Sequence, residues 1–174
     1  MRDTEIIEQF RRELGNPIGR HLYAVFGSYS ALGRFRQALG QVPGPDGTPF
    51  MQPLSVTRGI LDSIPDEEFR QLAEREPILP NAAAQRVKRA FEEILRAAVE
   101  NRDIVVLSEL EMVFAYGIDI ALLRALATDK KRILLLLPGR RRGDRVVLYP
   151  DVEGCDHTLP STLVSENHLW ELDE

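Results

Sequence analysis

Three short runs of this sequence contain only apolar residues, and they constrain the fold more than any other feature. The runs are residues 22–26, 104–107 and 133–137. A strand that is apolar at every position has both of its faces covered, as in a parallel sheet with helices on either side. Helical spacing of apolar residues at 3–14, 81–100 and 118–127 supplies those helices. The sequence therefore predicts an α/β fold of three layers, with a mainly parallel sheet flanked by helices.

The remaining elements are less sharply marked. We expect helices at 34–39 and 62–73, the second with Ile64, Phe69 and Leu72 as its apolar face, and a short strand at 50–56. Residues 145–149 are expected to pair with 133–137 across a turn at 139–143, which makes a C-terminal β-hairpin. Residues 162–172 have weak strand character, and Trp170 there is either a core anchor or an exposed contact for a partner. A length of 174 residues predicts a single domain, residues 1–174.

Composition limits the class of protein. The chain has 44% hydrophobic and 28% charged residues, which is typical of a globular protein. Its net charge of −5 gives no overall attraction to nucleic acid. Its single cysteine fits a reducing compartment. The first residues include no apolar segment of a signal peptide, and no apolar run is long enough to cross a membrane. We therefore expect a cytoplasmic protein that does not bind membranes.

The loop after the first apolar run is the first candidate site. It reads Gly27-Ser28-Tyr29-Ser30-Ala31-Leu32-Gly33-Arg34-Phe35. A strand, a glycine-bounded loop and a helix are the parts of a phosphate-binding P-loop. The spacing is one residue too long, Arg34 replaces the lysine, and Phe35 replaces the hydroxyl that binds Mg²⁺. The predicted phosphate contacts are Gly27, Ser28, Ser30, Gly33 and Arg34. The alternative is a plain turn between a strand and a helix.

The loop after the second apolar run is the second candidate site. Residues 104–107 lead into Ser108 and Glu109. In a Walker B element, a strand of this kind ends in an acidic pair that serves Mg²⁺ and the attacking water. Ser108 replaces the aspartate, and Glu109 remains as the candidate catalytic base. Glu111 would share a face with Glu109 if the strand extended that far. The alternative is that both are ordinary acidic residues at the end of a strand.

The order of these parts resembles a small P-loop NTPase. More narrowly, the chain is similar to the small P-loop protein of BREX phage-defence systems. In that family a Walker-B-like strand runs into an acidic stretch with Leu and Phe, matched here by residues 108–114. A short helix, a strand, a glycine turn and a tyrosine-containing strand follow, compared here with 137–139 and 148–150. The resemblance implies ATP or GTP with Mg²⁺ as ligand, bound weakly because the loop at 27–35 is altered.

A basic segment is the third candidate site. The arginines Arg140, Arg141, Arg142 and Arg145 fall in and beside the expected hairpin turn. A flexible arginine turn is suited to contacting DNA or RNA phosphates or an acidic partner. The alternative is that these side chains are simply solvated.

No metal site is predicted from the histidines and the cysteine. His21, His157 and His168 are scattered along the chain. Cys155-Asp156-His157 has no further ligand at a useful spacing.

Three hypotheses about function follow. The first is a degenerate P-loop NTPase-like accessory or assembly subunit of a phage-defence or DNA-processing complex, with little hydrolysis, because the lysine and the aspartate are both replaced. The second is an unusual ATP or GTP hydrolase that uses Arg34 as phosphate clamp and Glu109 as base. The third is a nucleic-acid-binding module that acts through Arg140–Arg145. Neither a partner protein nor an oligomeric state follows from the sequence.

Overall fold

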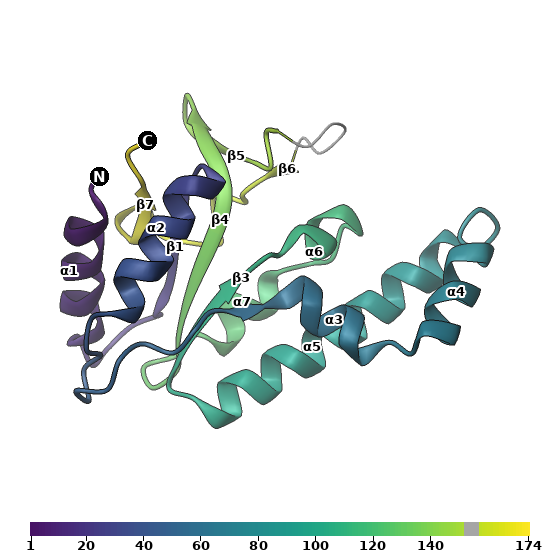
Figure 1. Ribbon diagram of the computed structural model, residues 1–174, viewed down its shortest axis with the longest axis horizontal. Coiled ribbons are helices and arrows are strands. Elements are labelled where there is room, and N and C mark those ends of the chain that lie inside the picture. The colour runs from purple at the N-terminus through teal and green to yellow at the C-terminus, as the bar shows by residue number, and fades with distance from the viewer. Residues whose placement is uncertain (152–156) are drawn as a thin grey trace.

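A parallel sheet forms the centre of the molecule (Figure 1), of which the computed structural model describes residues 1–151 and 157–174. The strands are ordered β2-β3-β4-β1-β7, and each neighbouring pair is parallel. Their bounds are β1 (Leu22–Gly27), β2 (Leu54–Ser55), β3 (Ile104–Ser108), β4 (Arg132–Arg142) and β7 (Leu169–Glu171). The predicted α/β fold with a mainly parallel sheet is confirmed.

Helices cover both faces of this sheet (Figure 1). One face packs against α1 (Asp3–Leu14) and α2 (Tyr29–Gly40). The other packs against α3 (Val56–Ser63), α5 (Pro80–Asn101), α6 (Glu111–Ala115) and α7 (Ala121–Leu126). Helix α4 (Asp66–Arg75) and the beginning of α5 project away from the sheet (Figure 1). No helix in the described part of the chain has the length and apolarity to span a membrane.

Strand β4 explains why helices are needed on both faces. Leu134 and Leu136 belong to the apolar cluster under α1 and α2. Ile133, Leu135 and Leu137 alternate with them and belong to the cluster under α3 and α5. All five side chains are at most 3% exposed. Because alternate side chains of a strand point to opposite faces, an all-apolar strand is stable only when both faces are covered.

The hairpin differs from its prediction: β5 pairs with residues 139–142 and not with 133–137, which pair with β1 and β3 instead. Strand β4 does not end near Pro138 but continues to Arg142, where it pairs antiparallel with β5 (Arg145–Leu148). The turn is only Gly143-Asp144, and Gly143 has a φ of +63°. Gly139 permits the extension, because a Cβ there would lie 2.8 Å from the carbonyl oxygen of Val147. Strand β6 (His157–Thr158) pairs with β5 in turn.

Several predicted boundaries also shift. The strand expected at 50–56 is reduced to β2, because Ser55 caps α3 by accepting a hydrogen bond from the Arg58 N–H. The helix expected at 62–73 is divided between α3 and α4 at Ile64-Pro65, since proline favours an extended residue before it. Helix α5 begins at Pro80 rather than after Asn81. In the tail, a short 3-10 helix (Glu166–His168) precedes β7. Trp170, 3% exposed, is a core anchor.

A buried polar pair lies at the amino end of β1. The Nδ1 atom of His21 is 2.6 Å from the hydroxyl of Tyr23, and the two residues are 3% and 0% exposed. The ring of Tyr23 stacks on Trp170 at 5.6 Å. Burial lowers the pKa of His21, and the charge of Arg132 lowers it further. Burial raises the pKa of Tyr23 to about 12. Both shifts favour the neutral side chains in the folded protein.

The raised pKa of Tyr23 predicts a loss of stability in alkaline solution. An exposed tyrosine in the unfolded chain ionises near pH 10, so above that pH the unfolded state releases its proton first and is favoured. We expect the free energy of unfolding to fall by roughly 1.4 kcal/mol between pH 9 and 11 through this residue. Urea unfolding at several pH values measures it, and in Tyr23→Phe this part of the decrease should vanish. Equal alkaline losses in the two proteins would contradict the prediction.

Candidate functional site

The two loops singled out in the sequence meet at a small crevice on the carboxyl edge of the sheet. The crevice has a volume of about 160 Å³. It is lined from α2 by Tyr29, Leu32, Gly33 and Arg36, from the end of β3 and the start of α6 by Ser108, Glu109 and Glu111, and from β4 by Leu136 and Pro138. Ligands of open α/β sheets bind at this edge. The position is therefore the one expected for a functional site.

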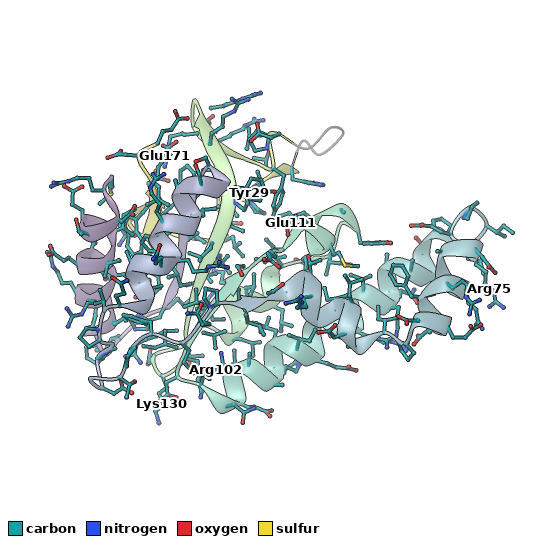
Figure 2. All side chains as sticks on the ribbon, in the orientation of Figure 1. Tyr29, Arg75, Arg102, Glu111, Lys130 and Glu171 are labelled. Carbon is teal, nitrogen blue, oxygen red and sulfur yellow. The ribbon has the colours of Figure 1, made fainter. Side chains whose placement is uncertain are left out.

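Tyr29 and Glu111 face each other across the crevice (Figure 2). The hydroxyl of Tyr29 donates a hydrogen bond to Oε1 of Glu111 over 3.4 Å. Strand β3 ends at Ser108, so Glu111 begins α6 and does not share a strand face with Glu109 as the sequence suggested. The two carboxylates nevertheless line the same crevice, because the chain turns between them.

Glu109 has a strained backbone that its neighbours hold in place. Its φ is +55°, in the left-handed region that a side chain disfavours. Its carbonyl oxygen accepts a hydrogen bond from the N–H of Thr57 over 2.8 Å, and its carboxylate accepts one from the hydroxyl of Ser55. Both partners lie at the start of α3, beside β3 in the sheet. Strain held in this way is common at functional sites, and here it fixes the candidate base at the end of β3.

The predicted phosphate loop is wrong in its shape. Strand β1 ends at Gly27 and α2 begins at Tyr29, so a single residue, Ser28, connects them. Ser28 is the N-cap of the helix, and its hydroxyl oxygen accepts a hydrogen bond from the N–H of Ala31 over 3.2 Å. This cap starts the helix five residues earlier than the sequence analysis expected. Ser30 lies in the first turn of α2, with its hydroxyl 3.1 Å from that of Ser28.

The two glycines that suggested a phosphate loop have other roles. A Cβ on Gly27 would lie 3.0 Å from the Cβ of Leu172, so Gly27 allows the segment after β7 to pack against β1. Gly33 lies inside α2, and no atom lies within 4 Å of the place where its Cβ would be. Neither glycine has a positive φ, so neither bends the chain around an anion.

The arginine in the crevice is Arg36, not Arg34. Because α2 begins at Tyr29, residues 29, 32, 33 and 36 share one helical face, which borders the crevice. Arg34 lies on another face and donates a 3.4 Å hydrogen bond to the carbonyl oxygen of Asp173. Phe35 is fully buried in the core. Recognition of Ser28 as an N-cap would have identified Arg36 from helical spacing alone.

The basic segment lies mostly in a paired strand rather than in a free turn. Arg140, Arg141 and Arg142 lie in β4, and only Gly143-Asp144 forms the turn. Arg141 forms ion pairs with Glu166 at 3.0 Å and Glu171 at 3.8 Å, and it stacks on Phe26. Its guanidinium therefore anchors the hairpin to the C-terminal segment. Arg140, Arg142 and Arg145 remain exposed.

The described residues include no group of three or more His, Cys, Asp or Glu side chains placed to hold a metal ion. Of the Cys155-Asp156-His157 segment, the first two residues lie outside the described part of the chain. His157 packs against the ring of Phe114. The side chains that border the crevice offer two carboxylates and one guanidinium, a combination that can bind a polar or cationic group better than a polyphosphate.

Comparisons of the chain with protein-family models, curated proteins and solved structures found no match. Function must therefore be argued from the geometry and chemistry of the site.

The shape of the β1–α2 connection predicts opposite effects for two alanine substitutions. Gly33→Ala should stabilise the protein by roughly 0.5–1 kcal/mol, because alanine favours a helix and its methyl group meets open space. Gly27→Ala should destabilise it by roughly 1–3 kcal/mol, because the methyl group is crowded against Leu172. Urea unfolding of the two variants measures both. A large loss of stability in Gly33→Ala would mean that residue 33 is in a glycine-requiring loop rather than in a helix.

Proposed function

We propose that this chain is a P-loop NTPase-like accessory or assembly subunit that does not hydrolyse nucleotides by itself. The resemblance of its sequence to the small P-loop protein of BREX systems supports a role in a phage-defence or DNA-processing complex. The observation that carries the absence of hydrolysis is the one-residue connection between β1 and α2. A P-loop needs several residues between strand and helix to surround phosphate with backbone N–H groups. Ser28 alone does not supply them.

The arrangement of the sheet supports the P-loop NTPase part of the proposal. The strand before the altered loop is β1, and the strand before Glu109 is β3. A later strand, β4, lies between them and is parallel to both. The two landmark strands therefore flank β4 and end at the same edge of the sheet, where ligands of open α/β sheets bind. This is an argument from fold, and it says nothing of activity by itself.

The size and charge of the crevice support the loss of hydrolysis. At about 160 Å³ it is smaller than the 300–1,000 Å³ typical of small-molecule sites. Its two carboxylates, Glu109 and Glu111, would repel the phosphates of a nucleotide, and Arg36 is the one basic residue in its lining among the described residues. The lysine and the Mg²⁺-binding hydroxyl that stabilise phosphoryl transfer have no counterparts here. Arg34, needed as a clamp in an active hydrolase, is directed to Asp173 instead.

The projecting helices support a role in assembly. Helix α4 contains no buried residue. At the connection between α4 and α5, Ile78 and Leu79 are 79% and 54% exposed. These two adjacent apolar side chains, exposed at the end of a projecting element, are available for contact with another protein. The chain thus has a small ligand crevice together with exposed apolar side chains on its projecting helices.

Thermal unfolding with and without nucleotide tests the proposal. We expect millimolar Mg·ATP, Mg·GTP and their diphosphates to leave the melting temperature unchanged. A ligand at 100 times its Kd would instead stabilise the folded state by about 2.7 kcal/mol and raise Tm by roughly 5–10 °C. Arg36→Ala and Arg34→Ala, measured in parallel, identify which arginine is responsible if a shift occurs.

A hydrolysis assay separates the proposal from an unusual hydrolase. Phosphate release from Mg·ATP by the purified chain should equal the release in buffer alone. Turnover that Glu109→Gln abolishes would overturn the proposal and assign Glu109 the role of catalytic base. Glu93→Gln, which changes an exposed carboxylate on α5, is the matched control.

A further inference from the structure

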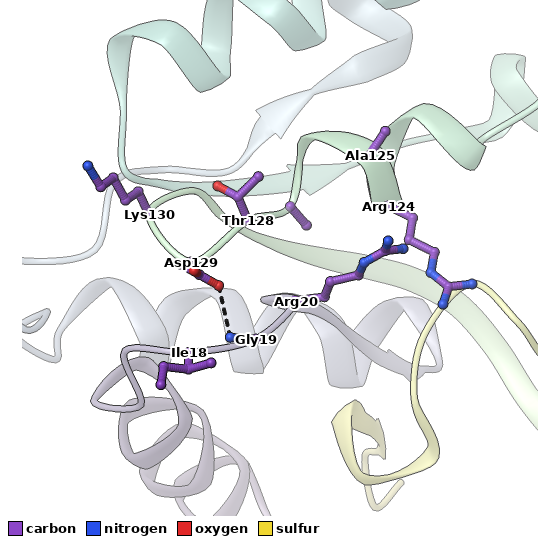
Figure 3. Close-up of a pocket in the computed structure, with 9 residues that line it drawn as sticks. Ile18, Gly19, Arg20, Arg124, Ala125, Thr128, Asp129 and Lys130 are labelled. Atoms are coloured by element: carbon purple, nitrogen blue, oxygen red, sulfur yellow. Dashed lines mark hydrogen bonds between the residues drawn. The ribbon is translucent and has the colours of Figure 1, made fainter.

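A second recess lies at the amino edge of the sheet, opposite the crevice. It consists of two adjoining cavities of about 610 and 290 Å³ that share Arg20 and Arg124. Figure 3 shows the larger of the two. Arg20 precedes β1, Arg124 lies in α7, and Thr128 to Lys130 precede β4. We call this recess the amino-edge groove.

The groove concentrates positive charge in an acidic protein. The chain has 27 acidic and 22 basic residues. The larger cavity is lined by Arg20, Arg124 and Lys130, with Asp129 as its acidic residue. Oδ1 of Asp129 already accepts a hydrogen bond from the N–H of Gly19 over 2.9 Å (Figure 3). Among the described residues, no acidic side chain lines the smaller cavity, whose lining combines the two arginines with Ser161, Thr162 and Ser165. Such a lining attracts anions.

The two guanidinium groups are directed to the same opening (Figure 3). Nη1 of Arg124 donates a 2.7 Å hydrogen bond to the carbonyl oxygen of Thr162, which orients the group and leaves its other N–H donors free for a ligand. In the described part of the chain, no carboxylate pairs with Arg20. Guanidinium groups with free N–H donors can donate two parallel hydrogen bonds to a pair of phosphate oxygens.

We propose that the amino-edge groove binds the phosphate backbone of nucleic acid, as a site separate from the crevice and from the hairpin arginines. The ligand is an extended one, because Arg20, Arg124 and Lys130 line the larger cavity and the two arginines also border the smaller cavity beside it, so the charges do not surround one enclosed point. No aromatic side chain lines the groove in the described residues, so bases are not stacked and the contact is to phosphate and sugar. Binding is thus independent of sequence and sensitive to salt. The inference does not depend on the proposed loss of nucleotide hydrolysis.

Fluorescence anisotropy with a labelled DNA duplex of mixed sequence tests the inference on the full chain. We expect Arg20→Ala/Arg124→Ala to weaken binding about tenfold at 50 mM salt. The slope of log K against log salt should fall by about 2, since two phosphate contacts are lost. Arg89→Ala/Arg96→Ala removes the same charge from exposed positions of α5 and should leave binding almost unchanged. Arg20→Ala alone should give about half of the change in slope without removing the hydrogen bond that Arg124 makes.

The other outcomes overturn the inference. Duplex binding that is absent in the unsubstituted protein, or equal in the groove variant and the α5 variant, excludes the groove as a nucleic-acid site. Loss of binding only in Arg140→Ala/Arg142→Ala assigns the contact to the hairpin instead. Inorganic phosphate that raises Tm through Arg20 while duplex DNA does not bind would identify a free-phosphate site, which also contradicts the proposal. Changes in Tm on addition of nucleotide test the proposal about the crevice, and DNA binding tests the proposal about the amino-edge groove. Failure of one proposal is therefore distinguishable from failure of the other.

Discussion

Burial of β4 on both faces is the constraint on which the rest of the structure depends. Its five apolar residues, Ile133 to Leu137, lie between β3 and β1, and each face needs its own layer of helices. The chain therefore sends α2 to one face after β1 and α6 to the other after β3. These two departures open the crevice at the carboxyl edge, with β4 as its floor. The position of the candidate site is thus a consequence of how the core is buried.

Much of this architecture could be predicted from the sequence, for a physical reason. Short continuous apolar runs rich in β-forming residues are typical of buried parallel strands, so β1, β3 and the first half of β4 were recognisable from residue types and run length. The sequence also predicted that the loops after β1 and β3 lie close together, because the carboxyl ends of parallel strands share one edge of the sheet. The lining of the crevice did not follow. The lining depends on Ser28, whose capping hydrogen bond starts α2 earlier than predicted. With this start, Arg36 rather than Arg34 lies on the helical face that borders the crevice.

The elements that were missed depend on contacts between distant parts of the chain. Arg140 to Arg142 read as a turn, since Pro138 and Gly139 precede them, yet they pair with β5 across a two-residue turn. Strand β7 has only three residues and is defined by its pairing with β1. Glu109 takes its left-handed conformation because Ser55 and Thr57, more than fifty positions away, hold it. Local preference carries no information about such partners.

The length of β4 has a mechanical consequence. One continuous strand passes from the middle of the parallel sheet into the hairpin. Leu136 and Pro138 line the crevice, and Arg140 and Arg142 follow them on the same strand. A protein that binds the hairpin and displaces it would therefore rotate β4 between its neighbouring strands, β3 and β1. Such a force would change the width of the crevice without any contact to it.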